Sequence, residues 1–349
     1  MKRTQNEKIL QIKNETLVVG IDIGKETHYA RAFDSRGLEL AKLLRFSNSA
    51  EGYNALRTWM QSTMQQKGKT DAIVGFEPTG HYWFSLGDYL RNQGYKLGIV
   101  NPYHVKCARE LDDNRQTKTD LKDPKTIAML VKDGRYRDVY IPSNCYQELR
   151  EAVLERERLV EQMTALSNQV IRWLDIRFPE FTKVFKSWKG KTAFATLKQF
   201  PTPVKVAQAG PEGLIALWQQ HVKRNYALKA QQLFQAAKTS IGRVSGSNAA
   251  EVVLQNLLVQ YELAASQLEQ IEALLSDLVL TVPHSDTLLD VKGIGKLSTA
   301  VIISEIGEIQ RFSSPRQIVS LAGLSLIENS SGRHKGQPTI SKRGRKRLR

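Results

Sequence analysis

Residues 16–46 constrain the fold of this chain more than any other segment, because they read as three short β-strands joined by tight turns. The expected strands cover 16–23, 28–34 and 38–46, and the turn DSRG at 34–37 joins the last two. Such a run of neighbouring strands is a β-meander. It predicts a sheet that begins with three antiparallel strands.

Alternating helical and strand patterns follow the meander as far as Pro142. They are a helix from 50 to about 64, a buried strand at 71–77, a helix at 81–93, a strand at 96–100 and helical segments at 102–111 and 124–132. A meander followed by alternating helices and strands is the element order of a ribonuclease-H-like α/β fold. We therefore expect residues 1–142 to form one such domain.

Asp22 stands inside the apolar first strand, LVVGIDI. A carboxylate in a β-run costs free energy unless something pairs with it, and a metal ion is a common partner. Glu77 ends the fourth strand, and Asp120 and Asp123 lie in TKTDLKDPKTIAML. In a ribonuclease-H-like domain the first and fourth strands are neighbours and a late helix packs its first turn against their ends. The four carboxylates would then converge.

Close carboxylates repel one another by about 4 kcal/mol per pair at an effective dielectric near 20, and divalent cations relieve this repulsion. Two Mg²⁺ ions about 3.5–4 Å apart would hold a scissile phosphate between its attacking and leaving oxygens.

Each acid except Asp22 also has a simpler interpretation. Asp123 precedes Pro124 and fits a helix N-cap with Pro at the first helical position. Asp120 fits a solvated loop, and Glu77 before Pro78 fits the start of a turn. Asp-x-Gly after an apolar strand also opens the actin-like and sugar-kinase ATPases, but those folds need a second Gly-rich phosphate loop, which this sequence lacks.

The spacing of apolar residues in 143–284 predicts long helices. Apolar residues recur with a heptad period in 146–176, at Leu149, Val153, Val160, Met163, Val170 and Leu174, although Arg156 and Ser167 occupy intervening positions. A second such helix, at about 249–281, carries Leu254, Leu258, Tyr261, Ala265, Leu268, Ile271, Leu275 and Leu278. We expect a coiled coil, formed within one chain or between chains, with a small helical insertion near 186–245.

Residues 285–349 open with LLDVKGIGKLSTAVIISEIG, a Gly-x-Gly turn between two helical patterns. The pattern resembles a helix-hairpin-helix, whose backbone N–H groups can hold a phosphate. Lys292 and Lys296 beside the turn are candidate nucleic-acid contacts. A tight turn between two helices that only packs a core would look the same.

The net charge is +16, from 51 Lys+Arg against 35 Asp+Glu, and this excess suggests a polyanionic partner. Half of it lies in residues 333–349, with eight Lys/Arg and no acid. The candidate phosphate contacts there are Arg333, Lys335, Lys342, Arg343, Arg345 and Lys346. The alternative is a disordered, solvated tail, but TISKRG favours an ordered phosphate-contacting loop.

No apolar run of about 18 residues is present, and the start MKRTQNEKIL lacks the apolar segment of a signal peptide. We therefore expect a cytoplasmic protein, associated with a prokaryotic nucleoid, with no membrane partner.

Cys107 and Cys145 lack metal-ligand spacing and are expected to be packed thiols.

Eight ordered blocks carry a resemblance to a known family: GIDIGKETH, GFEPTGHYW, NPYHVK, KTDLKDPKTIA, LLDVKGIGKLSTA, RFSSPRQIVSLAGL, SSG and ISKRG. Together they resemble the DEDD insertion-sequence transposases of the IS110 family, which are relatives of the Piv-type DNA invertases. The resemblance covers the chain to about residue 140 and again from 288 to 349.

This resemblance implies a site-specific DNA recombinase with a RuvC-like N-terminal domain, a coiled-coil middle and a small, mainly α C-terminal transposase domain. Asp22, Glu77, Asp120 and Asp123 would be its catalytic, Mg²⁺-binding acids. Ser331 of the Ser-Gly motif would be the nucleophile, with the adjacent Ser330 as the alternative. A structured bridge RNA, encoded by the element, would select the donor and target DNA.

We expect a homodimer or homotetramer, because the long helical connection lets the acids of one subunit be completed by the serine domain of another. One alternative is a hydrolytic Holliday-junction-type nuclease with water in place of serine. The other is a non-catalytic nucleic-acid-binding protein.

Two departures from the family pattern are Leu326, where Pro is frequent, and the end at Arg349, where relatives continue.

Overall fold

The computed structural model describes residues 4–112, 122–142, 144–223, 226–328, 330–331 and 334–349. The chain divides into two compact units. The first consists of Met1–Ile141 with Arg311–Ser313, and the second of Pro142–Gln310 with Ser314–Arg349. A further boundary at residue 284 remains a prediction.

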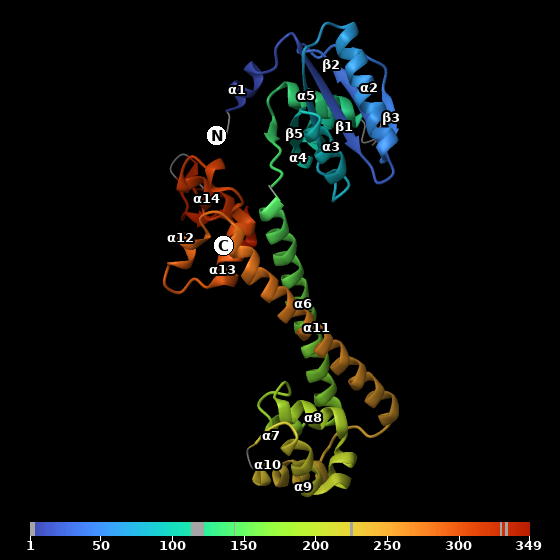
Figure 1. The fold of residues 1–349 in the computed structure, drawn as a ribbon, viewed down its shortest axis with the longest axis vertical. Helices are drawn as coiled ribbons and strands as arrows, with labels where there is room; N and C mark the ends of the chain where they lie inside the picture. Colours follow the sequence, from blue (N-terminus) through green and yellow to red (C-terminus); the bar gives the residue numbers. More distant parts are fainter. Residues whose placement is uncertain (1–3, 113–121, 143, 224–225, 329, 332–333) are drawn as a thin grey trace. The chain divides into compact units, whose positions relative to one another are not determined.

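The first unit is built on a six-stranded mixed sheet with the order β3-β2-β1-β4-β5-β6 (Figure 1). β1 pairs antiparallel with β2 and parallel with β4, so the expected neighbourhood of the first and fourth strands is confirmed. The strands are β1 (Thr16–Ile23), β2 (Thr27–Phe33), β3 (Leu44–Ser47), β4 (Asp71–Phe76), β5 (Lys96–Val100) and β6 (Tyr136–Asp138).

Helices cover both faces of this sheet. Leu17, Val19 and Ile21 of β1 point into a core shared with α2 and α3, whereas Val18 points into a core shared with α4 and α5. This alternation follows from the period of two in a strand. The helices of the unit are α1 (Gln5–Leu10), α2 (Ala50–Gln66), α3 (Phe84–Asn92), α4 (Pro102–Asp112) and α5 (Asp123–Lys132).

The third strand is shorter than the sequence pattern predicts. Only Leu44–Ser47 forms β3, and a single bridge at Glu39 precedes it. The reason lies in the turn, where the buried carboxylate of Asp34 accepts hydrogen bonds from the N–H groups of Arg36 and Leu38 at 2.9 and 2.8 Å. This turn leaves Leu38 57% exposed, while Leu40 and Ala41 after it are only partly buried against the core. The pattern also missed α1 and β6.

Two long antiparallel helices, α6 (Asn144–Arg177) and α11 (Ser247–Thr281), form the stem of the second unit (Figure 1). Leu149 near the start of α6 shares a core with Leu275 near the end of α11. Near the other end of the stem, the indole N–H of Trp173 donates to the carbonyl of Ala250 at 2.7 Å. The two predicted helices therefore pack against each other within one chain, while their supercoiling remains a prediction.

One position of the predicted heptad pattern is wrong. Val160 is 36% exposed, and Leu159 is buried in its place. The neighbouring contact position is Arg156, whose guanidinium pairs with Glu272 of α11 at 2.7 Å. This polar pair interrupts the apolar contacts between the two helices. After it, the next buried apolar residue of α6 is Leu159, one residue earlier than the heptad count from Val153 predicts.

A helical insertion at residues 178–245 lies between the two stem helices in the sequence and has its own core. Trp218 is almost fully buried, and its indole N–H donates to the hydroxyl of Thr196 at 2.8 Å. The rings of Phe185 and Trp218 meet edge to face, with centroids 5.7 Å apart. The helices of the insertion are α7 (Phe181–Val184), α8 (Lys191–Gln199), α9 (Pro203–Gln219) and α10 (Ala227–Lys238).

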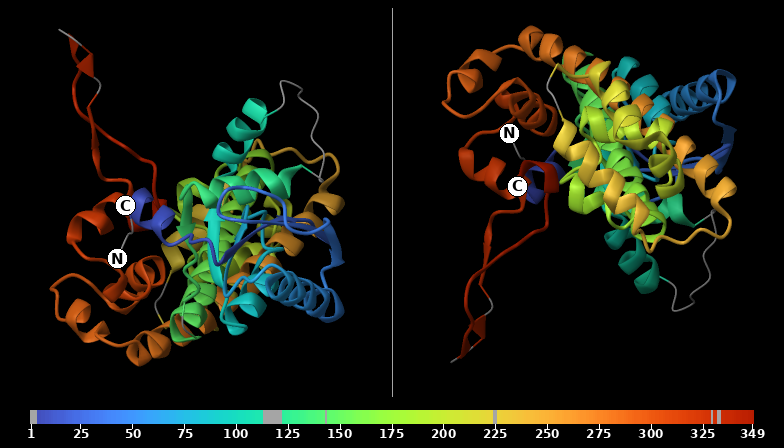
Figure 2. Two further views of the ribbon diagram at one scale, coloured as in Figure 1. Left: turned by 90° about the horizontal axis from the view of Figure 1, so that it is seen from above. Right: turned by 90° about the horizontal axis from the view of Figure 1, so that it is seen from below.

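The C-terminal part of the second unit comprises short helices and a two-stranded arm. Strands β7 (Leu326–Ile327) and β10 (Thr339–Ile340) pair, and beyond them β8 (Ser330–Ser331) pairs with β9 (His334–Lys335). Figure 2 shows this arm extending away from the helices beside it. The other elements are α12 (Ser285–Leu289), α13 (Lys296–Ile306), η1 (Ile309–Arg311), α14 (Pro315–Ala322) and η2 (Lys346–Leu348).

In the part of the chain that the structure describes, no helix is both long and apolar enough to cross a membrane.

Candidate active site

Asp22 and Glu77 occupy matching positions on two neighbouring strands. Asp22 is the penultimate residue of β1, and Glu77 directly follows β4. Because Ile21 is in register with Phe76 on these parallel strands, the next residue on each strand is one of the two acids. Adjacent parallel strands lie about 4.8 Å apart and point matching side chains to the same face. The two partly exposed acids therefore sit side by side at the carboxyl ends of β1 and β4.

Two glycines bring α5 onto the face of the sheet that these acids share. A Cβ added at Gly20 would lie 2.0 Å from the carbonyl oxygen of Pro124, and one at Gly75 would lie 2.2 Å from a methyl carbon of Val131. Only glycine allows α5 to approach the strands so closely at these two positions. Asp22 follows Gly20 by two residues, and Glu77 follows Gly75 by two, so both acids are on the α5 side of the sheet.

Asp123 is the first residue of α5 and is 4% exposed. The N-cap of α5 is Lys122, and no side chain caps the helix, so the interpretation of Asp123 as an N-cap is wrong. The carboxylate of Asp123 instead accepts a hydrogen bond from the guanidinium of Arg109 on α4, at 2.8 Å. A buried carboxylate needs such compensation.

Carboxylate oxygens are the ligands that Mg²⁺ prefers, so the chemistry of these acids fits a divalent cation. Among the described residues, however, no group of three or more His, Cys, Asp or Glu side chains is arranged as a metal site. Asp120, the fourth candidate, lies outside the described residues. The structure thus places Asp22, Glu77 and the first turn of α5 on one side of the sheet without assembling a complete ligand set.

We expect Arg109→Leu to lower the free energy of unfolding by about 3 kcal/mol, because it removes the guanidinium that compensates buried Asp123. Chemical denaturation of the full chain without metal would measure this loss. The matched control is Arg91→Leu, which removes an exposed pair with Asp88 on α3 and should cost under about 1 kcal/mol. If Asp123 binds Mg²⁺, the cation should stabilise Arg109→Leu more than the parent. Equal stabilisation would remove Asp123 from the metal site.

His28 lies in the block GKETH but belongs to the core. It is fully buried on β2, and its ring centroid is 5.1 Å from that of Phe46. Burial lowers the pKa of His28, against a smaller opposing effect of Asn48. The imidazole is therefore neutral at pH 7 and stays inside the sheet packing.

The candidate nucleophile lies in the arm formed by residues 326–340, which we call the serine arm. The backbone of Ser331 pairs with His334, and that of Ser330 with Lys335. The side chains of these four residues lie outside the described part of the structure, as do residues 332–333 and with them Arg333. At the base of the arm Leu326 is 70% exposed and belongs to β7.

The candidate nucleic-acid contacts of the second unit differ in their surroundings. Lys292, Lys296, Lys342, Arg343 and Lys346 are exposed. Arg345 is partly buried, and its guanidinium binds the backbone carbonyl and, at 3.2 Å, the buried carboxylate of Glu305 on α13. Arg345 therefore has a place in the packing of the fold, which its sequence context did not reveal.

The sequence matches two family models at the two ends of the chain. Residues 19–179 match the model of the DEDD transposases of IS110, described as "Transposase", and residues 285–349 match the model described as "Transposase IS116/IS110/IS902 family". The two matches belong to one family and together cover more than half of the chain. The chain belongs to the IS110 family of transposases. It is therefore an enzyme of the DNA transposase and recombinase class.

Individual relatives agree with this assignment. The transposase is 22% identical to the insertion element IS110 43.6 kDa protein of Streptomyces coelicolor, over 90% of this chain and 76% of that protein. It is 25% identical to the mini-circle putative transposase for IS117 of the same organism, over 91% of this chain and 78% of the relative. A pilin gene-inverting protein of Moraxella lacunata is 30% identical over 111 residues, 32% of each chain.

Proposed function

We propose that this transposase cuts and rejoins DNA strands with a Mg²⁺-dependent set of acids and a serine nucleophile. The observation that carries the proposal is the placement of Asp22 and Glu77 next to each other at the ends of two parallel strands, on the face that receives α5 and Asp123. Asp22, Glu77, Asp120 and Asp123 would hold the cations, two in number. The match to a DEDD family model supports a divalent metal.

Ser331 would supply the attacking oxygen. As the bond between its Oγ and the phosphorus forms, the bond from phosphorus to the 3′-oxygen of the cut strand breaks, and the seryl proton ends on that leaving oxygen. The energy of the broken phosphodiester is conserved in the phosphoserine, so a second 3′-hydroxyl can reverse the step and reseal the strand without ATP. The bound cations would lower the pKa of the attacking hydroxyl and stabilise the leaving oxygen.

The exposed cations near the serine arm, Lys342 and Arg343, would balance the charge of the phosphate in the transition state. The resemblance to the family further suggests that a structured bridge RNA selects the donor and target DNA and that the protein works as a dimer or tetramer. Sequencing of RNA that co-purifies with the protein from its native host tests the first point. A discrete structured RNA would support guidance, and its absence would count against it.

The proposed chemistry is tested by titrating Mg²⁺ into a mixture of the protein, the RNA that co-purifies with it and supercoiled DNA that carries the ends of the element. We expect nicked or rejoined products to appear only with the cation, and to disappear in EDTA. Cleavage that leaves free ends with no protein attached would favour the hydrolytic nuclease. Binding without cleavage at any Mg²⁺ concentration would favour the non-catalytic binder.

A further inference from the structure

The positive charge of the transposase is concentrated in two separate segments. Residues 178–245, the helical insertion, contain nine Lys and two Arg against two acids, Glu180 and Glu212. With the basic segment 333–349, this insertion holds more than the whole net charge of +16, so the rest of the chain is slightly acidic. The insertion also falls almost entirely between the two family matches, which leave residues 180–284 uncovered.

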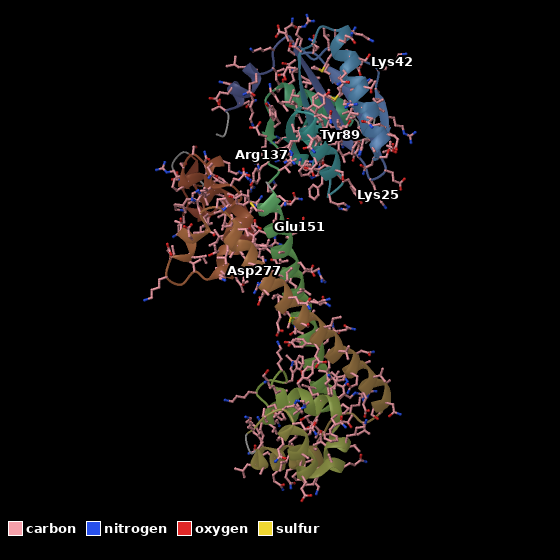
Figure 3. All side chains as sticks on the ribbon, viewed as in Figure 1. Lys25, Lys42, Tyr89, Arg137, Glu151 and Asp277 are labelled. Carbon is pink, nitrogen blue, oxygen red and sulfur yellow. The ribbon has the colours of Figure 1, made fainter. Side chains whose placement is uncertain are left out.

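The stem that carries the insertion has the opposite sign. Helix α11 contains five acids and neither Lys nor Arg. Exposed acids are found on both stem helices, and Glu151 on α6 and Asp277 on α11, labelled in Figure 3, lie at the end of the stem away from the insertion. A polyanion is therefore attracted to the insertion and repelled by the stem, which localises any contact.

Five lysines gather around the turn between α7 and α8, and we call them the lysine cluster: Lys183, Lys186, Lys189, Lys191 and Lys229. The first four lie within nine residues, KVFKSWKGK, and are exposed. Lys229 comes from α10, and its ammonium lies 4.3 Å from the centroid of the Phe185 ring, beside that turn. The ammonium of Lys189 lies 5.4 Å from the ring of Tyr261.

The turn that carries these lysines is anchored in the core of the insertion. Phe185 and Trp188 are 4% and 5% exposed, and each packs against further aromatic rings. Two buried side chains that alternate with exposed lysines hold the turn in one conformation. The charges are therefore presented from a fixed scaffold, which lowers the entropy lost when they bind a ligand.

The cluster differs in its ion pairing from Lys198 and Lys205, two other lysines of the insertion. Lys198 and Lys205 pair with Glu262 and Glu251 of α11, at 2.7 and 2.5 Å. Within the described ranges no lysine of the cluster forms an ion pair. The nearby carboxylate of Glu180 accepts hydrogen bonds from the hydroxyl of Ser240 and the N–H of Ile241, at 2.6 and 3.1 Å. Against the opposing effect of burial, these bonds, together with the charge of Lys183, lower the pKa of that carboxyl.

We propose that the lysine cluster binds the phosphate backbone of duplex DNA, without reading its sequence, at a site separate from the acids and the serine arm. Lysine ammonium groups are compact point charges without the planar fork of arginine, so a cluster of lysines favours contacts with phosphates. The aromatic rings of the turn are buried, so they offer no platform for stacking single-stranded bases. Duplex DNA is the polyanion on which transposases act. The insertion then gives the enzyme a second binding site for the same DNA molecule.

The test compares the salt dependence of DNA affinity, measured by fluorescence anisotropy in EDTA, between the full-length protein and variants. The probe is a duplex of about 40 base pairs with no element sequence. The test variant combines Lys183→Gln, Lys186→Gln, Lys189→Gln and Lys191→Gln. In this variant the negative slope of log affinity against log salt should become less steep by about 0.9 for each lost phosphate contact, or about 3 to 4 in all. Substitution of the same four lysines by Arg should keep the slope.

The matched control is Lys198→Gln with Lys205→Gln, which removes two exposed lysines of the same insertion that already pair with acids. This control should leave the slope unchanged. An unchanged slope in the fourfold Gln variant, with the parent binding normally, would overturn the proposal and leave the strand-transfer chemistry untouched. A loss of affinity for a structured RNA but not for the duplex would also overturn it, since the cluster would then serve RNA. No DNA binding by the parent would contradict the proposed function itself.

Discussion

Replacing Asp22 by Asn should reduce strand cleavage in Mg²⁺ by at least about two to three orders of magnitude. The substitution keeps the shape of the side chain but removes the negative charge beside Glu77, which is what a divalent cation would need. Affinity for DNA in EDTA should stay close to that of the parent, because Asp22 contacts no phosphate in the proposed site. Nicking of supercoiled DNA and equilibrium binding measure the two effects.

The control for this substitution is Asp88→Asn, an acid on α3 whose ion-pair partner in the described part of the chain is Arg91. It makes the same chemical change outside the proposed site and should leave cleavage unchanged. Retained cleavage by Asp22→Asn would remove Asp22 from the metal-binding set. Equal losses in both variants would point to a general effect of surface charge.

Replacing Ser331 by Ala should abolish strand exchange while DNA affinity, metal-dependent stabilisation and oligomeric state remain. The substitution deletes one hydroxyl in the serine arm, and without it no phosphoserine can form. Ser330→Ala removes the neighbouring hydroxyl and serves as the matched control, which should remain active. If the two results are exchanged, the nucleophile is Ser330 and the chemistry is unaffected. Full activity in both variants would contradict serine catalysis.

The frame of the first unit could be predicted from the sequence, because strand periodicity and turn residues are local signals. Strand β1 coincides with the prediction, and its parallel pairing with β4 followed from the order of elements. The start of the third strand was less predictable. The turn before this strand depends on hydrogen bonds from backbone N–H groups to the carboxylate of Asp34. The alternation of apolar residues contains no information about these bonds.

Among the candidate acids, sequence alone left Asp123 with two interpretations. The N-cap interpretation rested on Pro124, a local signal, whereas the true partner is Arg109, from a different helix. Such pairs depend on how helices pack. Two signals for that packing were present, since Gly20 and Gly75 stand two residues before Asp22 and Glu77, but their meaning is visible only when α5 lies against them.

The distribution of positive charge was also only partly predictable. The segment at the C-terminal end was conspicuous because its eight cations fall in one short stretch without an acid, while those of the insertion are interleaved with core residues such as Phe185 and Trp188. Only the folded structure separates lysines with acidic partners from those of the lysine cluster. In the same way, the pairing of Arg345 with Glu305 joins residues 40 positions apart in the sequence.

The central claim is that DNA is cut by a side-chain oxygen, and the most direct test is to look for the covalent product. The protein and its co-purifying RNA would be incubated in Mg²⁺ with DNA carrying the element ends. The products would be denatured and digested, and nucleotide-linked peptides would be identified by mass spectrometry. The account predicts a phosphodiester bond between DNA and Ser331, formed only with the cation and absent from Ser331→Ala. Cleaved DNA with free ends and no linked peptide would contradict it.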